Sequence, residues 1–192
     1  MNIEDIEDIA QLQYHPALPV ALALIAFVVM LYIFKRRIKQ VWLNYRARSF
    51  LDHLANKQIS QLKCPDGLGH YFIIDRVLLR PDGITLLVFN KFPGKIFCAE
   101  NIDEWTQMLG QKGYRFKNPL YDLDCKIKAV KAYVPDVEVD GFLFFDNQAE
   151  FPKGHPQRVI FKGNMPDMLK RSRTKVQAPV LVAWEKLRKL SV

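Results

Sequence analysis

The sequence lacks the short motifs that usually hold metals or nucleotides. Its three cysteines are widely separated, form no Cys-x-x-Cys pair and do not group with the four histidines. This pattern suggests neither a zinc site nor a Cys-His nucleophile. There is also no Gly-x-x-x-x-Gly-Lys-Ser/Thr or Gly-x-Gly-x-x-Gly loop, so we predict no nucleotide-cofactor site. An odd number of separated thiols indicates a reducing compartment.

Basic residues are absent before residue 35, where the only charged side chains are acidic. Residues 16–34 form an uncharged apolar run whose helix would be roughly 28 Å long, close to the thickness of a bilayer's hydrocarbon core. A signal peptide would carry positive charge ahead of such a run, and a core helix is rarely apolar all round. Six basic residues then precede Asp52. The positive-inside rule therefore predicts a single-pass inner-membrane protein, with residues 1–15 outside and the C-terminal domain in the cytoplasm.

The part of the chain from residue 35 onward is strongly basic. It contains all 28 lysines and arginines but only 16 of the 20 acids, a formal charge of +12. Such a domain attracts nucleic acid or the anionic inner leaflet. Residues 35–62 are expected to form a basic juxtamembrane helix, and the basic cluster from Lys35 to Arg48 within it is expected to contact the lipid. Five later cations are candidates for binding nucleic acid, with an ordinary solvated face as the alternative: Lys162, Lys170, Arg171, Arg173 and Lys175.

Hydrophobic patterning in the C-terminal part is typical of a mixed α/β domain. Apolar segments at 70–79 and 84–90 flank Pro81-Asp82-Gly83, which predicts a β-hairpin. Further strands are expected at 95–99, 137–145 and 158–162, and helices at 101–105, 120–134 and 178–190. Asn164-Met165-Pro166 is expected to begin another helix. No internal repeat is visible.

One acid and one lysine in the hairpin are candidate site residues. Asp75 lies in an otherwise apolar strand and is a possible ligand for Mg²⁺, while Lys91 follows the next strand. Val88 and Asn90, near the end of that second strand, share one face because side chains alternate along a strand. Lys91 therefore faces the opposite side unless a bulge turns it. The alternatives are that Asp75 is a surface or salt-bridged residue and that Lys91 is an ordinary solvated lysine.

With Gly94-x-Ile96, Trp105 and Asn118-Pro119-Leu120, this hairpin resembles the NERD (nuclease-related) domain of the PD-(D/E)xK superfamily over residues 65–170. The resemblance implies a restriction-endonuclease-like αβββαβ core, followed by a helical extension at 171–192. It also implies a metal-binding acid at Asp75, completed by a Glu-x-Lys at the positions that hold Val88 and Asn90 here. Trp105 and Asn118-Pro119 are interpreted as structural.

The expected function is a membrane-anchored, catalytically degenerate nuclease-like domain with Asp75 and Lys91 as a vestigial site. It would bind nucleic acid or a protein partner at the cytoplasmic membrane face. Two alternatives stay open. A Mg²⁺-dependent nuclease would need relocated acids, drawn from Asp66, Asp82, Glu100 and Asp122. A membrane structural or assembly protein would have no role with nucleic acid.

Overall fold

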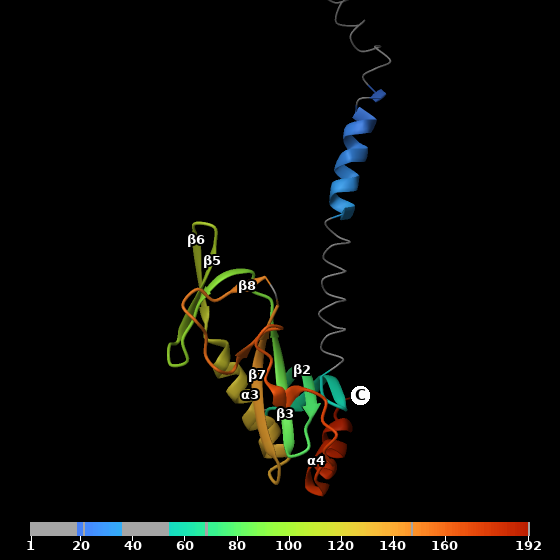
Figure 1. Ribbon diagram of the computed structural model, residues 1–192, viewed down its shortest axis with the longest axis vertical. Helices are drawn as coiled ribbons and strands as arrows, with labels where there is room; N and C mark the ends of the chain where they lie inside the picture. Colours follow the sequence, from blue (N-terminus) through green and yellow to red (C-terminus); the bar gives the residue numbers. More distant parts are fainter. Residues whose placement is uncertain (1–18, 21, 36–53, 68, 147, 192) are drawn as a thin grey trace, which may run out of the picture. The chain divides into compact units, whose positions relative to one another are not determined.

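The computed structural model describes residues 19–20, 22–35, 54–67, 69–146 and 148–191 (Figure 1). The chain divides into two units, Met1–Ser49 and Phe50–Val192. In the first unit, residues 19–20 and 22–35 are helical. No helix within the described ranges is long and apolar enough to cross a membrane. Residues 1–15, part of the expected span at 16–34 and most of the expected juxtamembrane helix lie outside the described residues.

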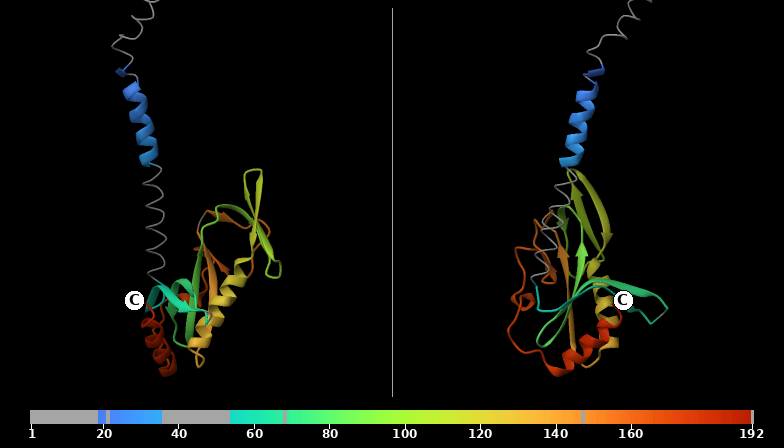
Figure 2. Two further views of the ribbon diagram at one scale, coloured as in Figure 1. Left: turned by 180° about the vertical axis from the view of Figure 1, so that it is seen from behind. Right: turned by 90° about the vertical axis from the view of Figure 1, so that its right-hand side faces the viewer.

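A five-stranded mixed sheet forms the centre of the second unit (Figures 1 and 2). Its order is β1-β2-β3-β7-β9, with bounds Gln58–Pro65, Tyr71–Leu79, Gly83–Asn90, Glu138–Phe145 and Val159–Ile160. The first three strands are antiparallel neighbours, whereas β7 runs parallel to β3 and β9 parallel to β7. A parallel step requires a crossover connection. Here the crossover from β3 to β7 contains the helix α3 (Pro119–Tyr133).

A second, four-stranded sheet is built largely from that crossover. Its order is β6-β5-β4-β8, with bounds Lys112–Lys117, Glu104–Leu109, Gly94–Phe97 and Ala149–Glu150. The β5–β6 hairpin extends away from the first sheet (Figure 1). Gly94 begins β4 with φ of +89°, and a Cβ there would lie 2.5 Å from the carbonyl oxygen of Met108. Glycine is therefore required where β4 meets β5.

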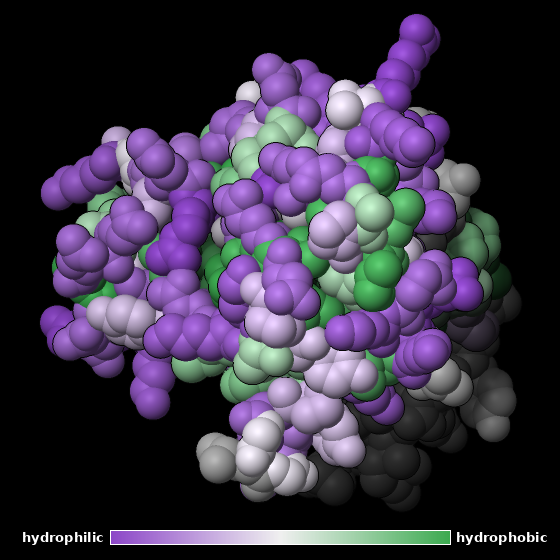
Figure 3. All heavy atoms as spheres, turned by 90° about the horizontal axis from the view of Figure 1, so that it is seen from below, coloured by the Kyte–Doolittle hydropathy of each residue, from purple (hydrophilic) through white to green (hydrophobic). Residues whose placement is uncertain are grey.

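Three apolar clusters hold these elements together. One face of the first sheet packs against α3 and the C-terminal helix α4 (Ala178–Arg188). The opposite face is covered by residues from Leu54, Ala55 and the short 3₁₀ helix η1 (Asp167–Leu169). The third cluster joins the two sheets and α3 through Val88, Ile96, Trp105, Leu120 and Phe145. From below, the surface is mostly hydrophilic, with hydrophobic residues visible between the polar side chains (Figure 3).

The structure corrects the last part of the helix expected at 35–62, because Gln58–Pro65 is the strand β1. Ile59 and Leu62 both face the core, and their three-residue spacing imitates a helical period. The cause is Gln61, whose φ of 52° breaks the alternation of the strand. The expected short helix at 101–105 is likewise wrong, since β5 begins at Glu104 and turns Trp105 and Gln107 inward.

The α/β class is confirmed, but the three successive strands are not the expected ones. They are β1, β2 and β3, followed by α3 and β7; the expected strand at 95–99 is β4, in the second sheet. The hairpin, the helix at 120–134, the strand at 137–145 and the C-terminal helix lie close to their predicted positions. The strand expected at 158–162 is shorter, and Pro166 precedes a single 3₁₀ turn instead of lying inside a helix.

Candidate functional site

Asp75 lies on β2 beside the end of β3. The β2–β3 register runs from Leu79 opposite Ile84 to Arg76 opposite Leu87. One residue further along each strand are Asp75 and Val88, on neighbouring strands as the hairpin predicted. At this point Oδ2 of Asp75 accepts a hydrogen bond of 2.8 Å from the backbone N–H of Phe89. The carboxylate thus takes the place of a strand carbonyl and extends the β2–β3 connection by one bond.

The pairing of Asp75 with β1 is also irregular. Ser60 pairs with Arg76 and Leu62 with Ile74, but Gln61 and Asp75, which lie between them, are not partners. The left-handed backbone of Gln61 locally disturbs the ladder, as a β-bulge does. Asp75 therefore lies at a break in regular pairing, where its side chain can reach the backbone of Phe89.

The two residues at the Glu-x-Lys positions contribute no charge. Val88 is only 7% exposed and packs in the apolar cluster that contains Ile96 and Trp105. Asn90 is half-buried, and its side-chain amide donates to the carbonyl oxygen of Val88 at 3.3 Å. Asp75 consequently has an apolar neighbour where a second metal-binding carboxylate would be needed.

Lys91 is exposed immediately after β3. Within the described part of the chain, no hydrogen bond or ion pair joins it to Asp75. The acids available to a relocated site are engaged elsewhere: Asp66 accepts from the backbone of His70 at 3.0 Å, Asp82 pairs with Arg80 at 3.3 Å, Glu100 with Arg158 at 3.6 Å and Asp122 with Lys126 at 2.6 Å. No group of three or more His, Cys, Asp or Glu among the described residues could hold a metal. The surroundings of Asp75 therefore do not fit a Mg²⁺ site.

A second polar cluster, which sequence reasoning missed, lies at the turn end of the same hairpin. Arg80 is only 4% exposed, and its Nη1 donates to Oδ2 of Asp140 on β7 at 2.5 Å. Asp140 is in register with the buried Thr85 on β3. Arg80 Nε makes no regular hydrogen bond but lies 3.3 Å from Oδ1 of Asp82. Thr85 Oγ1 and Asp140 Oδ1 are buried and form no regular hydrogen bond with the described residues. Burial raises the pKa of Asp140, although the neighbouring Thr85 hydroxyl and the guanidinium of Arg80 oppose this.

Trp105 and Asn118 have structural roles, as interpreted from the sequence. The buried Trp105 donates from its indole N–H to the carbonyl of Ala99 at 3.0 Å. Asn118 donates to the carbonyls of Glu100 at 3.0 Å and Ile102 at 2.8 Å, while its Oδ1 caps α3 by accepting from Leu120 N–H at 3.0 Å. Together they fix the loop between β4 and β5 onto the start of α3.

The five predicted nucleic-acid-binding cations are exposed and lie between β9 and α4: Lys162, Lys170, Arg171, Arg173 and Lys175. This basic segment is attached to the start of the domain, since Lys170 forms a β-bridge with Leu54 and Asn56 donates to the carbonyl of Ser172 at 2.5 Å. Lys170 also pairs with Asp167 at 2.5 Å. The segment is thus an ordered, charged surface, and its binding of nucleic acid stays a prediction.

Comparison with protein families gives a match between residues 37–146 and the nuclease-related domain, NERD. The match covers more than half of the 192 residues, so the chain belongs to the NERD family. This confirms the resemblance drawn from the hairpin and its following motifs. No curated protein and no solved structure matches the chain.

Proposed function

We propose that this chain is a non-catalytic NERD domain that binds nucleic acid at the cytoplasmic face of the inner membrane. The non-catalytic role is supported by the hydrogen bond from Phe89 N–H to the carboxylate of Asp75, which lies beside the buried Val88. The acid at the expected metal position is engaged in strand pairing, and its neighbour on β3 is Val88 instead of a second acid.

The chemistry of phosphodiester hydrolysis explains why this arrangement supports a non-catalytic role. Water activation at neutral pH needs a divalent ion held by carboxylates and a cation near the reacting phosphate. Removing one preorganised electrostatic contact commonly lowers the rate by about 10²–10³-fold. Here Val88 and Asn90 replace both charged groups of the expected pair, and Lys91 follows on the other face by strand alternation. Little turnover should remain.

Binding of nucleic acid is supported by the charge and exposure of the basic segment defined above. Lysines and arginines that contact phosphates release condensed counterions, which gives salt-dependent affinity without catalysis. The segment carries five cations, of which Lys170 is partly neutralised by Asp167. We therefore expect modest affinity that falls steeply with salt.

Anchoring in the membrane is supported by the uncharged run and by the helix at residues 22–35. Taken by itself, this helix exposes large apolar side chains around its circumference, with exposed fractions between 46% and 69% from Val20 to Phe34. Such a surface needs an apolar environment, which lipid would supply. The basic residues that follow in the sequence support a cytoplasmic position for the second unit, by the positive-inside rule. We therefore expect the chain to resist alkaline extraction from membranes. Added protease should digest the second unit only in inverted vesicles, and its digestion in intact cells would contradict this topology.

A cleavage assay tests the catalytic part. The full-length chain, with Mg²⁺ or Mn²⁺, should leave single- and double-stranded DNA and RNA intact, and Asp75→Ala should behave identically. Metal-dependent cleavage that disappears in Asp75→Ala would overturn the proposal and favour the active nuclease.

A binding assay tests the nucleic-acid part. Replacing Lys170, Arg171, Arg173 and Lys175 with glutamine should weaken oligonucleotide binding and reduce the slope of log K against log salt by up to about 0.7–0.9 per lost contact. A matched control removes four exposed cations elsewhere, with Lys95, Lys112, Lys117 and Lys128 changed to glutamine. The control should bind much more tightly than the first variant. Equal losses in the two variants, or no binding by the unmodified chain, would count against this surface.

A further inference from the structure

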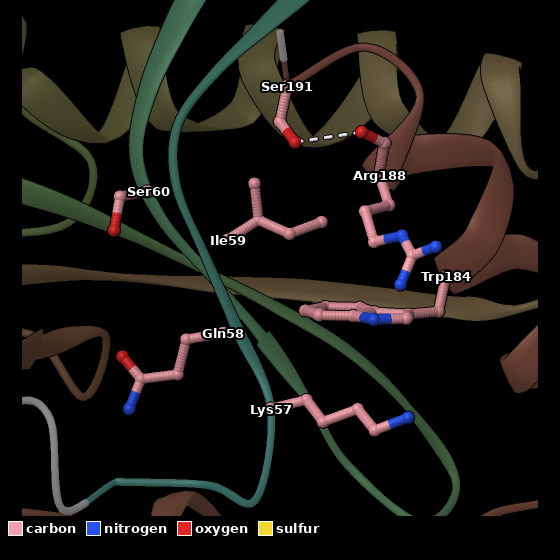
Figure 4. Close-up of a pocket in the computed structure, with 7 residues that line it drawn as sticks. All are labelled: Lys57, Gln58, Ile59, Ser60, Trp184, Arg188 and Ser191. Atoms are coloured by element: carbon pink, nitrogen blue, oxygen red, sulfur yellow. Dashed lines mark hydrogen bonds between the residues drawn. The ribbon is translucent and has the colours of Figure 1, made fainter.

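A hollow of about 500 Å³ lies between the edge strand β1 and the last turn of α4 (Figure 4). Its walls include Lys57 just before β1, Trp184 and Arg188 on α4, and Ser191 after that helix. Neither Asp75 nor the basic segment contributes to it. The proposed function therefore leaves this hollow unexplained.

The indole of Trp184 is an unusual element of this wall. The side chain is 3% exposed and packs in the core between the first sheet and α4. Its N–H has no acceptor among the described residues, yet it is not among the polar atoms sealed off from solvent. Buried tryptophan N–H groups usually have a hydrogen-bond partner. The hollow is where an acceptor from outside the protein can reach it.

Two cations flank this donor. In Figure 4 the indole of Trp184 lies between the side chains of Arg188 and Lys57, which line the same hollow. Lys57 is exposed and forms no ion pair within the described part of the chain. Arg188 pairs with Glu185 at 3.1 Å, and both side chains are largely exposed. Three nitrogen donors, two of them charged, thus border one open space.

The C-terminal end of α4 would ordinarily repel an anion, because the last carbonyls of a helix carry partial negative charge. Here the carbonyl of Arg188 accepts from the backbone N–H of Ser191 at 3.2 Å and from its hydroxyl at 2.8 Å. The carbonyls of Glu185 and Leu187 accept from Lys189 N–H at 3.4 Å and Leu190 N–H at 3.0 Å. These hydrogen bonds reduce the number of free carbonyls that the end of α4 presents to an anion.

We propose that this hollow binds the phosphate group of a small ester, either free in solution or as the headgroup of an anionic lipid. A phosphate offers several oxygens in different directions, which suits donors from an ammonium, an indole and a guanidinium better than a planar carboxylate does. The volume also leaves room for the rest of the ester. This inference does not depend on nucleic-acid binding by the basic segment.

The direct test is the ¹H–¹⁵N signal of the Trp184 indole in the full-length chain, assigned by its loss in Trp184→Phe. Titration with glycerol 3-phosphate should shift this signal saturably. Lys57→Gln and Arg188→Gln should each weaken binding about 10- to 100-fold, as expected for loss of a hydrogen bond to a charged group. Glu185→Gln should tighten binding, because it releases Arg188. Lys186→Gln removes a cation from the same helix that does not line the hollow, and it should change the affinity least.

A second experiment distinguishes a lipid headgroup from a free ester. The indole signal is compared for the chain in phosphatidylcholine nanodiscs that either contain or lack phosphatidate. A headgroup in the hollow would shift the indole signal in phosphatidate discs and leave no further shift for glycerol 3-phosphate. A free ester would shift the signal equally in both discs. No shift in either arm would overturn the proposal, as would a shift unchanged in Lys57→Gln and Arg188→Gln. A shift caused by an oligonucleotide but not by the ester would assign the hollow to a nucleic-acid surface and also overturn it.

Discussion

The two ends of the β2–β3 hairpin use charge in different ways. At the turn end, Arg80 is almost fully buried and contacts Asp140 and Asp82. At the open end, the half-buried Asp75 accepts from a backbone N–H and has no cationic partner among the described residues. Asp140 and Asp75 both connect neighbouring parts of the first sheet. An acid at a motif position is therefore not by itself a sign of metal chemistry.

The two ends should differ in energetic sensitivity. At the turn end, Thr85 Oγ1 and Asp140 Oδ1 are buried and form no regular hydrogen bond with the described residues, so the ion pair between Arg80 and Asp140 is the main compensation for desolvation there. The open end makes one well-formed hydrogen bond at partial exposure. Substitutions at the turn end should consequently change the free energy of unfolding more than those at Asp75.

The largest expected effect is that of Arg80→Met. It leaves the carboxylate of Asp140 partly buried without its main cation, and breaking such a pair costs about 3–5 kcal/mol. The loss should be greatest at neutral pH and smaller in acid, because Asp140 can then become neutral by protonation. Urea unfolding at several pH values measures this. If Arg80→Met lowers the free energy of unfolding less than Asp75→Ala does, the turn end is not the more sensitive end of the hairpin.

The stability of the unmodified chain should depend on pH through Asp140 at the turn end of the hairpin. Burial raises the folded-state pKa of Asp140 above that of an unfolded aspartate, so its protonation favours the folded state. This contribution is complete below the unfolded pKa and is lost as pH rises through the folded pKa. Relative to Asp140→Asn, the unmodified chain should therefore lose stability across that window. The opposite trend would mean that Arg80 more than offsets burial.

Asp75→Ala should have a smaller effect, about 1–2 kcal/mol, because one hydrogen bond to a charged acceptor at a partly exposed site is lost. Asp75→Asn keeps an acceptor oxygen for Phe89 N–H and should retain part of this energy. Denaturant unfolding of both variants gives the ranking. Equal destabilisation by alanine and asparagine would show that the charge, and not the acceptor, is what the site requires.

The smallest effect is expected at Lys91. Its side chain is exposed and has no partner within the described residues, so Lys91→Ala should change the free energy of unfolding by less than about 0.5 kcal/mol. A larger loss in the same unfolding experiment would indicate an interaction with the Asp75 end of the hairpin.

Local patterning was sufficient to predict the hairpin and the two well-formed helices of the second unit. The Pro81–Gly83 turn and the apolar strands on either side are local signals, and so is the Asn118-Pro119 start of α3. The strand β1 was missed because the left-handed Gln61 gives its inward residues a helical spacing. Gln61 itself is not paired, but its neighbours Ser60 and Leu62 pair with Arg76 and Ile74 of β2, and the local sequence does not reveal this pairing.

The candidate site could be located from the sequence but not explained by it. Asp75 was identified as a polar residue in an apolar strand, whereas its acceptor role depends on where β3 ends relative to β2. Arg80 and Asp140 lie 60 positions apart, and only the parallel pairing of β3 with β7 brings them together. Contacts set by sheet register are not visible in a linear pattern.

The central claim, that Asp75 pairs strands and does not hold a metal, is tested most directly by the effect of Mn²⁺ on thermal unfolding. A metal bound only to the folded state stabilises it by mass action, by about 2.7 kcal/mol at a hundredfold excess over Kd. The unmodified chain and Asp75→Asn should respond identically to Mn²⁺, with no saturable rise in Tm. A saturable rise in the unmodified chain that is absent in Asp75→Asn would contradict the account.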